Sequence, residues 1–190
     1  MNTDELNYNL QNNRENINSL KGLEIICEAI VYKVFDLFGK NALLSILFQI
    51  GAGPGEQISK RLKEIYNKDD FEPLEAFELL FKELSNYYSI QVRDLQEDDE
   101  KIKLIIENHC FLREPIKNRA NLKHGKAFCR VNKGYVETAL KKLIGDKISG
   151  LEIKFLYNDD EKDACVEELI FYKNLNQTDQ TDSRLVFNTD

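Results

Sequence analysis

Hydrophobic positions in the first half of the chain recur at the spacing of α-helices. Between residues 25 and 38 the apolar side chains fall three or four positions apart, and this pattern stops at Gly39. The next run, residues 42–50, is apolar on nearly all sides, which is typical of a central helix, and it also ends in a glycine, Gly51. The pattern therefore predicts two helices that end at these glycines.

A glycine-rich segment, GAGPG at residues 51–55, follows the second of these helices. It looks like part of a dinucleotide-binding fingerprint, but that fingerprint follows a strand, whereas here a helix precedes it. We therefore expect a turn between two helices. Apolar stripes then predict one helix at residues 56–66 and another at 73–84, where Pro73 suits the first turn.

After Tyr87 the hydrophobic pattern changes to the period of two that is typical of strands. The segments YSIQVRDL and KIKLIIEN alternate around the acidic turn QEDDE, which predicts a β-hairpin. A long helix at about 126–143 follows, and a second hairpin is predicted from LEIKFLY and ACVEELIFY around the turn NDDEKD. This order predicts an α+β domain with several N-terminal helices, a hairpin, a long helix and a second hairpin. The helices are expected to pack on a four-stranded antiparallel sheet.

Both ends of the chain are polar. Residues 1–20 are rich in Asn, and residues 174–190 are mostly Asn, Gln, Thr, Asp and Ser. Such segments bury too little apolar surface to offset the entropy of ordering them. We therefore expect flexible segments at 1–20 and 173–190 around one domain at 21–172.

Composition and charge limit the classes of function that the chain is expected to have. The net charge is -7 and there is no run rich in Lys or Arg, which disfavours nucleic-acid binding. The longest apolar stretch, residues 42–50, is far shorter than the roughly 20 residues that span a bilayer. The N-terminus also lacks the pattern of a secretory signal, so we expect a cytoplasmic protein without a transmembrane segment. Its four cysteines are expected to be reduced thiols.

Few residues are candidates for catalysis or metal binding. The imidazole bases are His109 and His124, and the carboxylates cluster at the hairpin tips, so we expect no enzyme active site. Cys129, Glu152 and Cys165 come from three segments that can meet at one end of a helix-plus-hairpin unit. Zinc favours thiolate ligands and prefers a set of four ligands. The alternative is that both cysteines are buried core thiols.

The segment Cys129–Tyr135, together with Ala139, Leu140 and Gly145, resembles the core of the 4-vinyl reductase domain. That domain is also the input domain of phenol- and xylene-sensing transcription activators. Residues 39–62 are similar to the early helices of the family, and the resemblance extends over residues 23–172.

The resemblance implies a zinc site and a ligand pocket. In the sensor members zinc is held at the places of Cys129, Glu152 and Cys165, but the remaining place is Phe155 instead of a Cys. Such a site would be completed by water or by His124, or would be absent. Sensor members also hold an apolar small molecule between sheet and helices, which implies wall residues at Phe111, Phe128, Tyr135 and Phe155. The alternative for these aromatic residues is a plain hydrophobic core.

The same topology is shared with the small subunits of the TRAPP vesicle-tethering complex, which are scaffolds without a metal. Dimers are common in both subfamilies, which implies a homodimer here. The leading expectation is a non-enzymatic cytoplasmic domain that binds a lipophilic small molecule and acts through a partner protein. The alternative is a TRAPP-like structural subunit without a ligand, and a third possibility is a reductase subunit.

Overall fold

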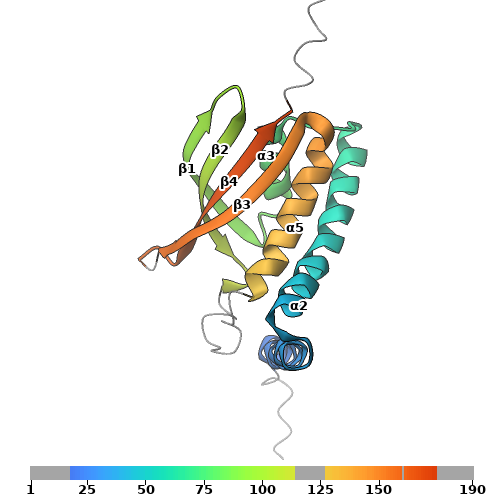
Figure 1. Cartoon of the computed structure of the whole chain (residues 1–190), viewed down its shortest axis with the longest axis vertical. Coiled ribbons are helices and arrows are strands. Elements are labelled where there is room, and N and C mark those ends of the chain that lie inside the picture. The colour runs from blue at the N-terminus through green and yellow to red at the C-terminus, as the bar shows by residue number, and fades with distance from the viewer. Residues whose placement is uncertain (1–17, 114–126, 160, 175–190) are drawn as a thin grey trace, which may run out of the picture.

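The computed structural model describes residues 18–113, 127–159 and 161–174. Within these ranges the chain forms an α+β domain of three α-helices, a short 3-10 helix and four strands (Figure 1). This arrangement confirms the fold class that the hydrophobic pattern predicts. The elements are α2 (Ser19–Tyr66), α3 (Pro73–Glu83), β1 (Tyr88–Glu97), β2 (Lys101–Cys110), α5 (Ala127–Ile144), η3 (Gly145–Lys147), β3 (Ile148–Asp159) and β4 (Ala164–Lys173).

The four strands form one antiparallel sheet with the order β1-β2-β4-β3. The two predicted hairpins therefore lie side by side, joined through β2 and β4, and Figure 1 shows α5 and α2 together on one side of them. Residues directly opposite each other on paired strands point to the same face of a sheet. The face that meets the helices carries Ile102, Leu104 and Ile106 from β2 with Leu169 and Phe171 from β4, all of them buried.

The main core fills the space between this face and the helices. Ala139, Leu140 and Leu143 of α5 and Leu80 of α3 are fully buried there. Burying side chains of this size is the dominant favourable term in folding, at roughly 25 cal/mol per Å² of apolar surface. The α5 helix and the helix-facing side of the sheet thus enclose the main core.

The expected turn at residues 51–55 is wrong, because the helix continues through it. Gly51 and Gly55 lie one helical turn apart on the side of α2 that faces α5, and Gly134 lies on the facing side of α5. A Cβ atom at Gly51 would lie 2.8 Å from the carbonyl carbon of Val131, and one at Gly134 would lie 2.9 Å from that of Phe48. The glycines thus serve a close backbone contact between two helices.

Gly39 does end the first helical segment, as predicted. Its φ of 77° and ψ of 176° are not helical, so α2 consists of two segments that meet at a kink. In Figure 1 the segment before Gly39 is seen end-on, below the segment that runs along α5. Within residues 19–38, Val31 is the one buried residue, and it packs with Leu43 and Leu47 in a small second core.

The expected boundaries at the ends lie mostly outside the described residues. Within the described residues, Ser19 and Leu20 belong to α2 and Lys173 ends β4. The domain bounds of 21 and 172 stay predictions. None of the helices in the described ranges combines the length and apolarity needed to span a bilayer.

Candidate functional site

A small cavity lies between α5 and the helix-facing side of the sheet. Its volume is about 30 Å³, enough for about two water molecules. Polar groups reach it from both layers and apolar side chains form the remaining wall. The lining residues are Asn108, Cys129, Asn132, Lys133 and Glu167, with Phe81, Tyr88, Ile106, Val136, Ile153 and Leu169.

Asn108 provides an unsatisfied hydrogen-bond acceptor at this cavity. The side chain is on the helix-facing side of β2 and is only 5% exposed. Its Nδ2 donates to Glu167 Oε2 over 3.2 Å, whereas Oδ1 has no hydrogen-bond partner among the described residues. The neighbouring carboxylate fixes this orientation, because the flipped amide would place two oxygens together. The cavity therefore presents an oxygen that accepts a hydrogen bond.

Tyr88 and Asn132 close one side of the cavity. The Tyr88 hydroxyl donates to Asn132 Oδ1 over 2.7 Å, which links β1 to α5. Burial raises the pKa of Tyr88, so its hydroxyl keeps its proton and remains a donor. Burial also raises the pKa of the nearby Cys110 thiol, and the hydrogen bond with Asn132 only partly opposes this shift. These groups are neutral at physiological pH.

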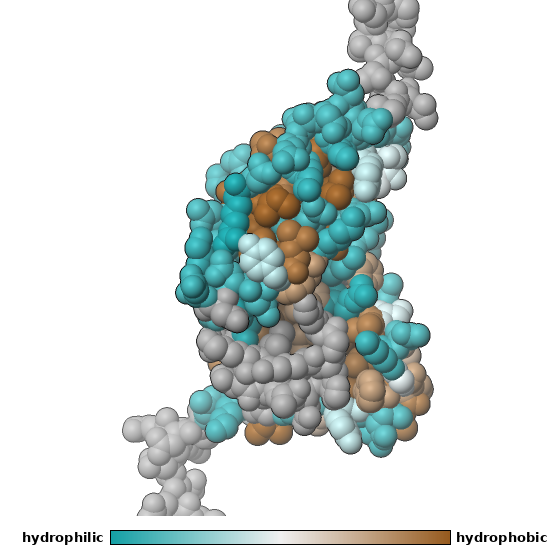
Figure 2. Space-filling view, turned by 60° about the vertical axis from the view of Figure 1, so that its left-hand side comes forward, coloured by the Kyte–Doolittle hydropathy of each residue, from teal (hydrophilic) through white to brown (hydrophobic). Residues whose placement is uncertain are grey.

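A second, open groove lies between α3 and β1. It has a volume of about 820 Å³ and a mostly apolar wall, which includes Leu74, Phe77, Ile90, Val92, Leu95 and Leu104. Figure 2, turned so that the β1 side comes forward, shows apolar surface gathered between polar surfaces. Phe81 and Tyr88 line both the groove and the cavity. These two aromatic side chains therefore border both spaces.

The four aromatic residues expected to form a pocket wall do not line the cavity. Tyr135 packs against the main core, and burial raises its pKa to about 12. Phe128 packs in the second core beside Val31, and Phe111 is 52% exposed, with ring contacts to tyrosines at 5.8 and 6.1 Å. Phe155 lies opposite Glu167 on the helix-facing side of β3.

The residues missed by the sequence analysis are polar ones on apolar faces. In the strand KIKLIIEN, Asn108 follows Ile102, Leu104 and Ile106 at a spacing of two, so it shares their buried face. An amide at the end of an apolar alternation is the signal that could have pointed to this site. The contact from Tyr88 to Asn132 spans 44 residues and has no comparable local signal.

The structure brings two of the three expected zinc ligands to the same side of the sheet. Cys129 lines the cavity, and Cys165 lies opposite Asn108 on the helix-facing side of β4. Glu152 pairs with Ile170 on the other face, where its carboxylate contacts Lys154 Nζ at 2.5 Å. Within the described ranges, no group of three or more His, Cys, Asp or Glu residues is placed to hold a metal ion, and His124 lies outside them. As placed, Cys129, Glu152 and Cys165 do not fit a shared zinc site.

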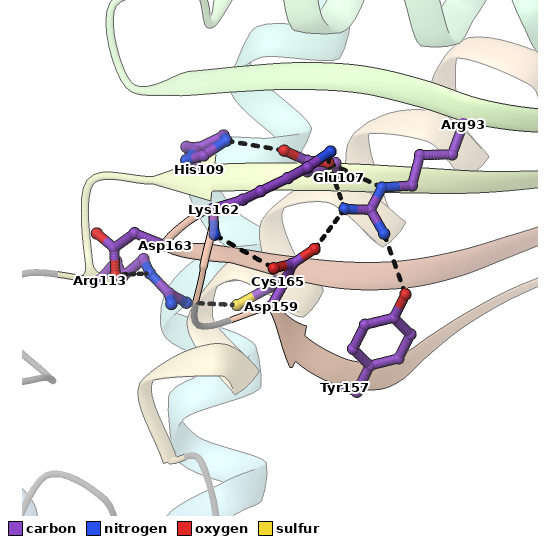
Figure 3. Close-up of polar contacts among 9 residues, drawn as sticks. All are labelled: Arg93, Glu107, His109, Arg113, Tyr157, Asp159, Lys162, Asp163 and Cys165. Atoms are coloured by element: carbon purple, nitrogen blue, oxygen red, sulfur yellow. Dashed lines mark hydrogen bonds and ion pairs between the residues drawn. The ribbon is translucent and has the colours of Figure 1, made fainter.

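The outer face of the sheet carries a charged network around Glu107 (Figure 3). Arg93 donates to Glu107 from Nε at 2.8 Å and from Nη2 at 2.5 Å, and it reaches Asp159 at 2.7 Å. Lys162 also contacts Glu107, at 3.1 Å, and the His109 ring lies 3.4 Å from its other oxygen. The Arg93 guanidinium lowers the pKa of Glu107. The network therefore ties the two hairpins together as a structural feature.

Comparisons with known proteins find similar structures but no matching family. No model of a known family matches the chain, and no curated protein matches it. One similar solved structure is the phenol-responsive sensory domain of the transcription activator PoxR with phenol. It has a TM-score of 0.46 and 13% identity, over 82% of this chain and 76% of that one. Another is a trafficking protein particle complex subunit 3 from Naegleria fowleri covalently bound to palmitic acid. Its TM-score is 0.49 at 11% identity, over 80% of this chain and 93% of that one. Membership in the 4-vinyl reductase family stays a prediction.

Proposed function

We propose that this chain is a non-enzymatic domain that binds a small lipophilic molecule carrying a hydrogen-bond donor. The supporting observation is the buried Asn108 Oδ1 atom, which lines the cavity between α5 and the sheet and has no partner among the described residues. A buried acceptor without a partner costs about 1–3 kcal/mol. A ligand hydroxyl or N–H group at this point would remove that cost.

The surroundings of Asn108 suit recognition of such a molecule. Ligand sites are mostly apolar with a few polar groups that fix orientation. Here Ile106, Val136 and Leu169 supply apolar wall, while Asn108 supplies the acceptor. Lys133 is engaged elsewhere, because its Nζ donates to the Ile153 carbonyl over 3.1 Å.

The same groups support the non-enzymatic part of the proposal. A general acid or base works best with a pKa near the operating pH. At this cavity the pKa of Tyr88 is raised well away from neutrality by burial, the Asn108 and Asn132 amides do not titrate, and the Glu167 carboxylate accepts a hydrogen bond from Asn108. His109 lies on the outer face of the sheet beside Glu107.

Native mass spectrometry of the purified chain tests the proposal. We expect a co-purified neutral molecule, or a mass shift when a lipophilic alcohol is added, that the Asn108→Leu variant loses. Asn41→Leu is the matched control, because Asn41 is an exposed residue of α2. The alternative is that two ordered water molecules satisfy Asn108. In that case all three proteins would give equal spectra, and this result would contradict the proposal.

The second candidate function is that of a structural subunit of the TRAPP type, which works as a homodimer or with another protein. The observation that favours it is the apolar surface of the first segment of α2. Large contiguous apolar surfaces mark protein–protein interfaces. Eight large side chains there are more than half exposed, namely Leu20, Leu23, Ile25, Ile26, Ile30, Tyr32, Leu37 and Phe38. Sedimentation velocity over a range of concentrations measures such assembly directly.

A further inference from the structure

We propose that the cavity at Asn108 and the groove between α3 and β1 form one binding site for a neutral amphiphile. Its hydroxyl or primary amide head lies at Asn108, and its extended apolar tail lies in the groove. This inference rests on the proposed function and adds the ligand class, the place of the tail and the route of access.

The sizes of the two spaces support this division. A protein cavity that takes up benzene measures about 150 Å³, whereas the cavity at Asn108 measures about 30 Å³. It has room for a head group but not for a ring or a chain. The groove, at about 820 Å³, has the room and the apolar wall that a tail requires.

The two spaces are also adjacent. Ile90 lines the groove, and it lies directly opposite Asn108 across the β1–β2 pair. Such antiparallel partners have Cα atoms about 4.5–5.5 Å apart. Phe81 and Tyr88 line both spaces. A chain that passes between these rings therefore reaches Asn108 directly.

The contacts of this wall show how it would open. The Phe81 ring lies edge-on to Tyr88, with ring centroids 6.0 Å apart, and is itself only partly buried. Tyr88 is held by its hydrogen bond to Asn132. The passage opens when Phe81 rotates away from Tyr88, and it would open more readily if Tyr88 lost the hydrogen bond that holds it. In the groove, Val92 is 46% exposed and Leu95 is 50% exposed, and an apolar tail would cover both side chains.

The chemistry around Asn108 selects the head group. An amide oxygen accepts hydrogen bonds, and an ionised carboxylate has no proton to donate to it. The Glu167 carboxylate, 3.2 Å from Asn108 Nδ2, also repels an anionic head. Alcohols and primary amides are therefore preferred over fatty acids.

Titration calorimetry with 1-butanol, 1-hexanol, 1-octanol and 1-decanol tests the inference. If the tail is buried, affinity rises about three- to fourfold for each added methylene. Val92→Glu, a change at an exposed position in the groove, is expected to flatten this dependence and to weaken 1-decanol far more than 1-butanol, whose short chain reaches less of the groove. Leu156→Glu is the matched control, since Leu156 is a similarly exposed strand residue that does not line the groove. Decanoate is expected to bind at least tenfold more weakly than 1-decanol.

The possible results separate the two proposals. The inference about the groove is overturned if alcohol binding does not depend on chain length. It is also overturned if Val92→Glu and Leu156→Glu change the binding equally. Either result leaves the cavity proposal standing. A groove filled by a second copy of the chain also overturns it, and Val92→Glu would then abolish a concentration-dependent dimer. Absence of binding for all four alcohols overturns both proposals.

Discussion

Ile90 and Asn108 lie directly opposite each other on β1 and β2, so that the wall of the open groove and the buried acceptor are cross-strand neighbours. This pairing joins an apolar surface to a hydrogen-bonding point within one strand spacing. The cavity supplies the polar anchor and a small apolar wall, and the groove supplies room for a longer apolar chain. Together they supply both the apolar contact and the polar anchor that such sites combine.

Substitution of Gly51 by alanine should destabilise the domain strongly. The new methyl group would overlap the Val131 carbonyl, which belongs to helix backbone that cannot easily move. We expect a loss of about 3 kcal/mol or more in the free energy of unfolding, measured with urea.

Gly53→Ala is the matched control for this prediction, because a Cβ there meets no atom within 4 Å. Replacing this exposed helical glycine should raise stability by about 0.5–1 kcal/mol. Equal effects of the two substitutions would contradict the close contact between α2 and α5.

Tyr88→Phe should loosen the wall between cavity and groove. The ring remains, but Asn132 Oδ1 loses the donor that now lies 2.7 Å away. We expect a loss of about 1–2 kcal/mol in the free energy of unfolding. Exchange measurements by NMR should show faster association of 1-octanol. An unchanged association rate would mean that Tyr88 does not control access.

Arg93→Met should remove part of the pH dependence of stability. The folded-state pKa of Glu107 is lowered, chiefly by its hydrogen bonds with Arg93. The resulting stabilisation is present above the unfolded-state pKa of about 4.3 and is lost as pH falls through the lower folded-state value. The variant should therefore melt at a lower temperature at pH 7 and lose less on acidification to pH 3.

Arg61→Met is the control for the charged network. The Arg61–Glu83 pair is largely exposed, so its removal should cost less than about 1 kcal/mol. If both arginine variants behave alike at pH 7, the network around Glu107 does not tie the hairpins together.

Ile26→Glu should shift the chain towards the monomer if the second candidate function holds. Ile26 is 57% exposed on the first segment of α2, so the monomer tolerates a charge there while an apolar interface does not. Sedimentation velocity should show a smaller species for the variant than for the unchanged chain. A monomer in both cases would contradict assembly through this surface.

The hairpins and the long helix were predictable because their signals are local. Alternation around an acidic tip defines each hairpin, and burial of Ile102, Leu104 and Ile106 follows from the same period. The segment at 51–55 was misread because Gly and Pro usually mark turns, whereas here the glycines serve a contact with residues some 80 positions later. The close contact depends on tertiary structure, and the residues around 51–55 in the sequence do not indicate it.

The candidate site was predictable only in part. Its general place, between sheet and helices, was expected, but Asn108 was missed, although it is a polar residue in register with the buried apolar positions of its strand. Phe111, Phe128, Tyr135 and Phe155 were chosen by residue type, but whether an aromatic ring lines a cavity or fills a core depends on distant neighbours. Glu152 was placed by resemblance, and the alternation of β3 puts it on the outer face.

The affinity for 1-octanol of the unchanged chain and of Asn108→Leu, measured by calorimetry, tests the central claim most directly. Leucine keeps the branched shape of the side chain and removes the amide oxygen, so the account predicts about a tenfold or larger loss of affinity. Asn41→Leu should bind as the unchanged chain does. Equal affinities for all three proteins would show that Asn108 is not the anchor of a ligand and would contradict the account.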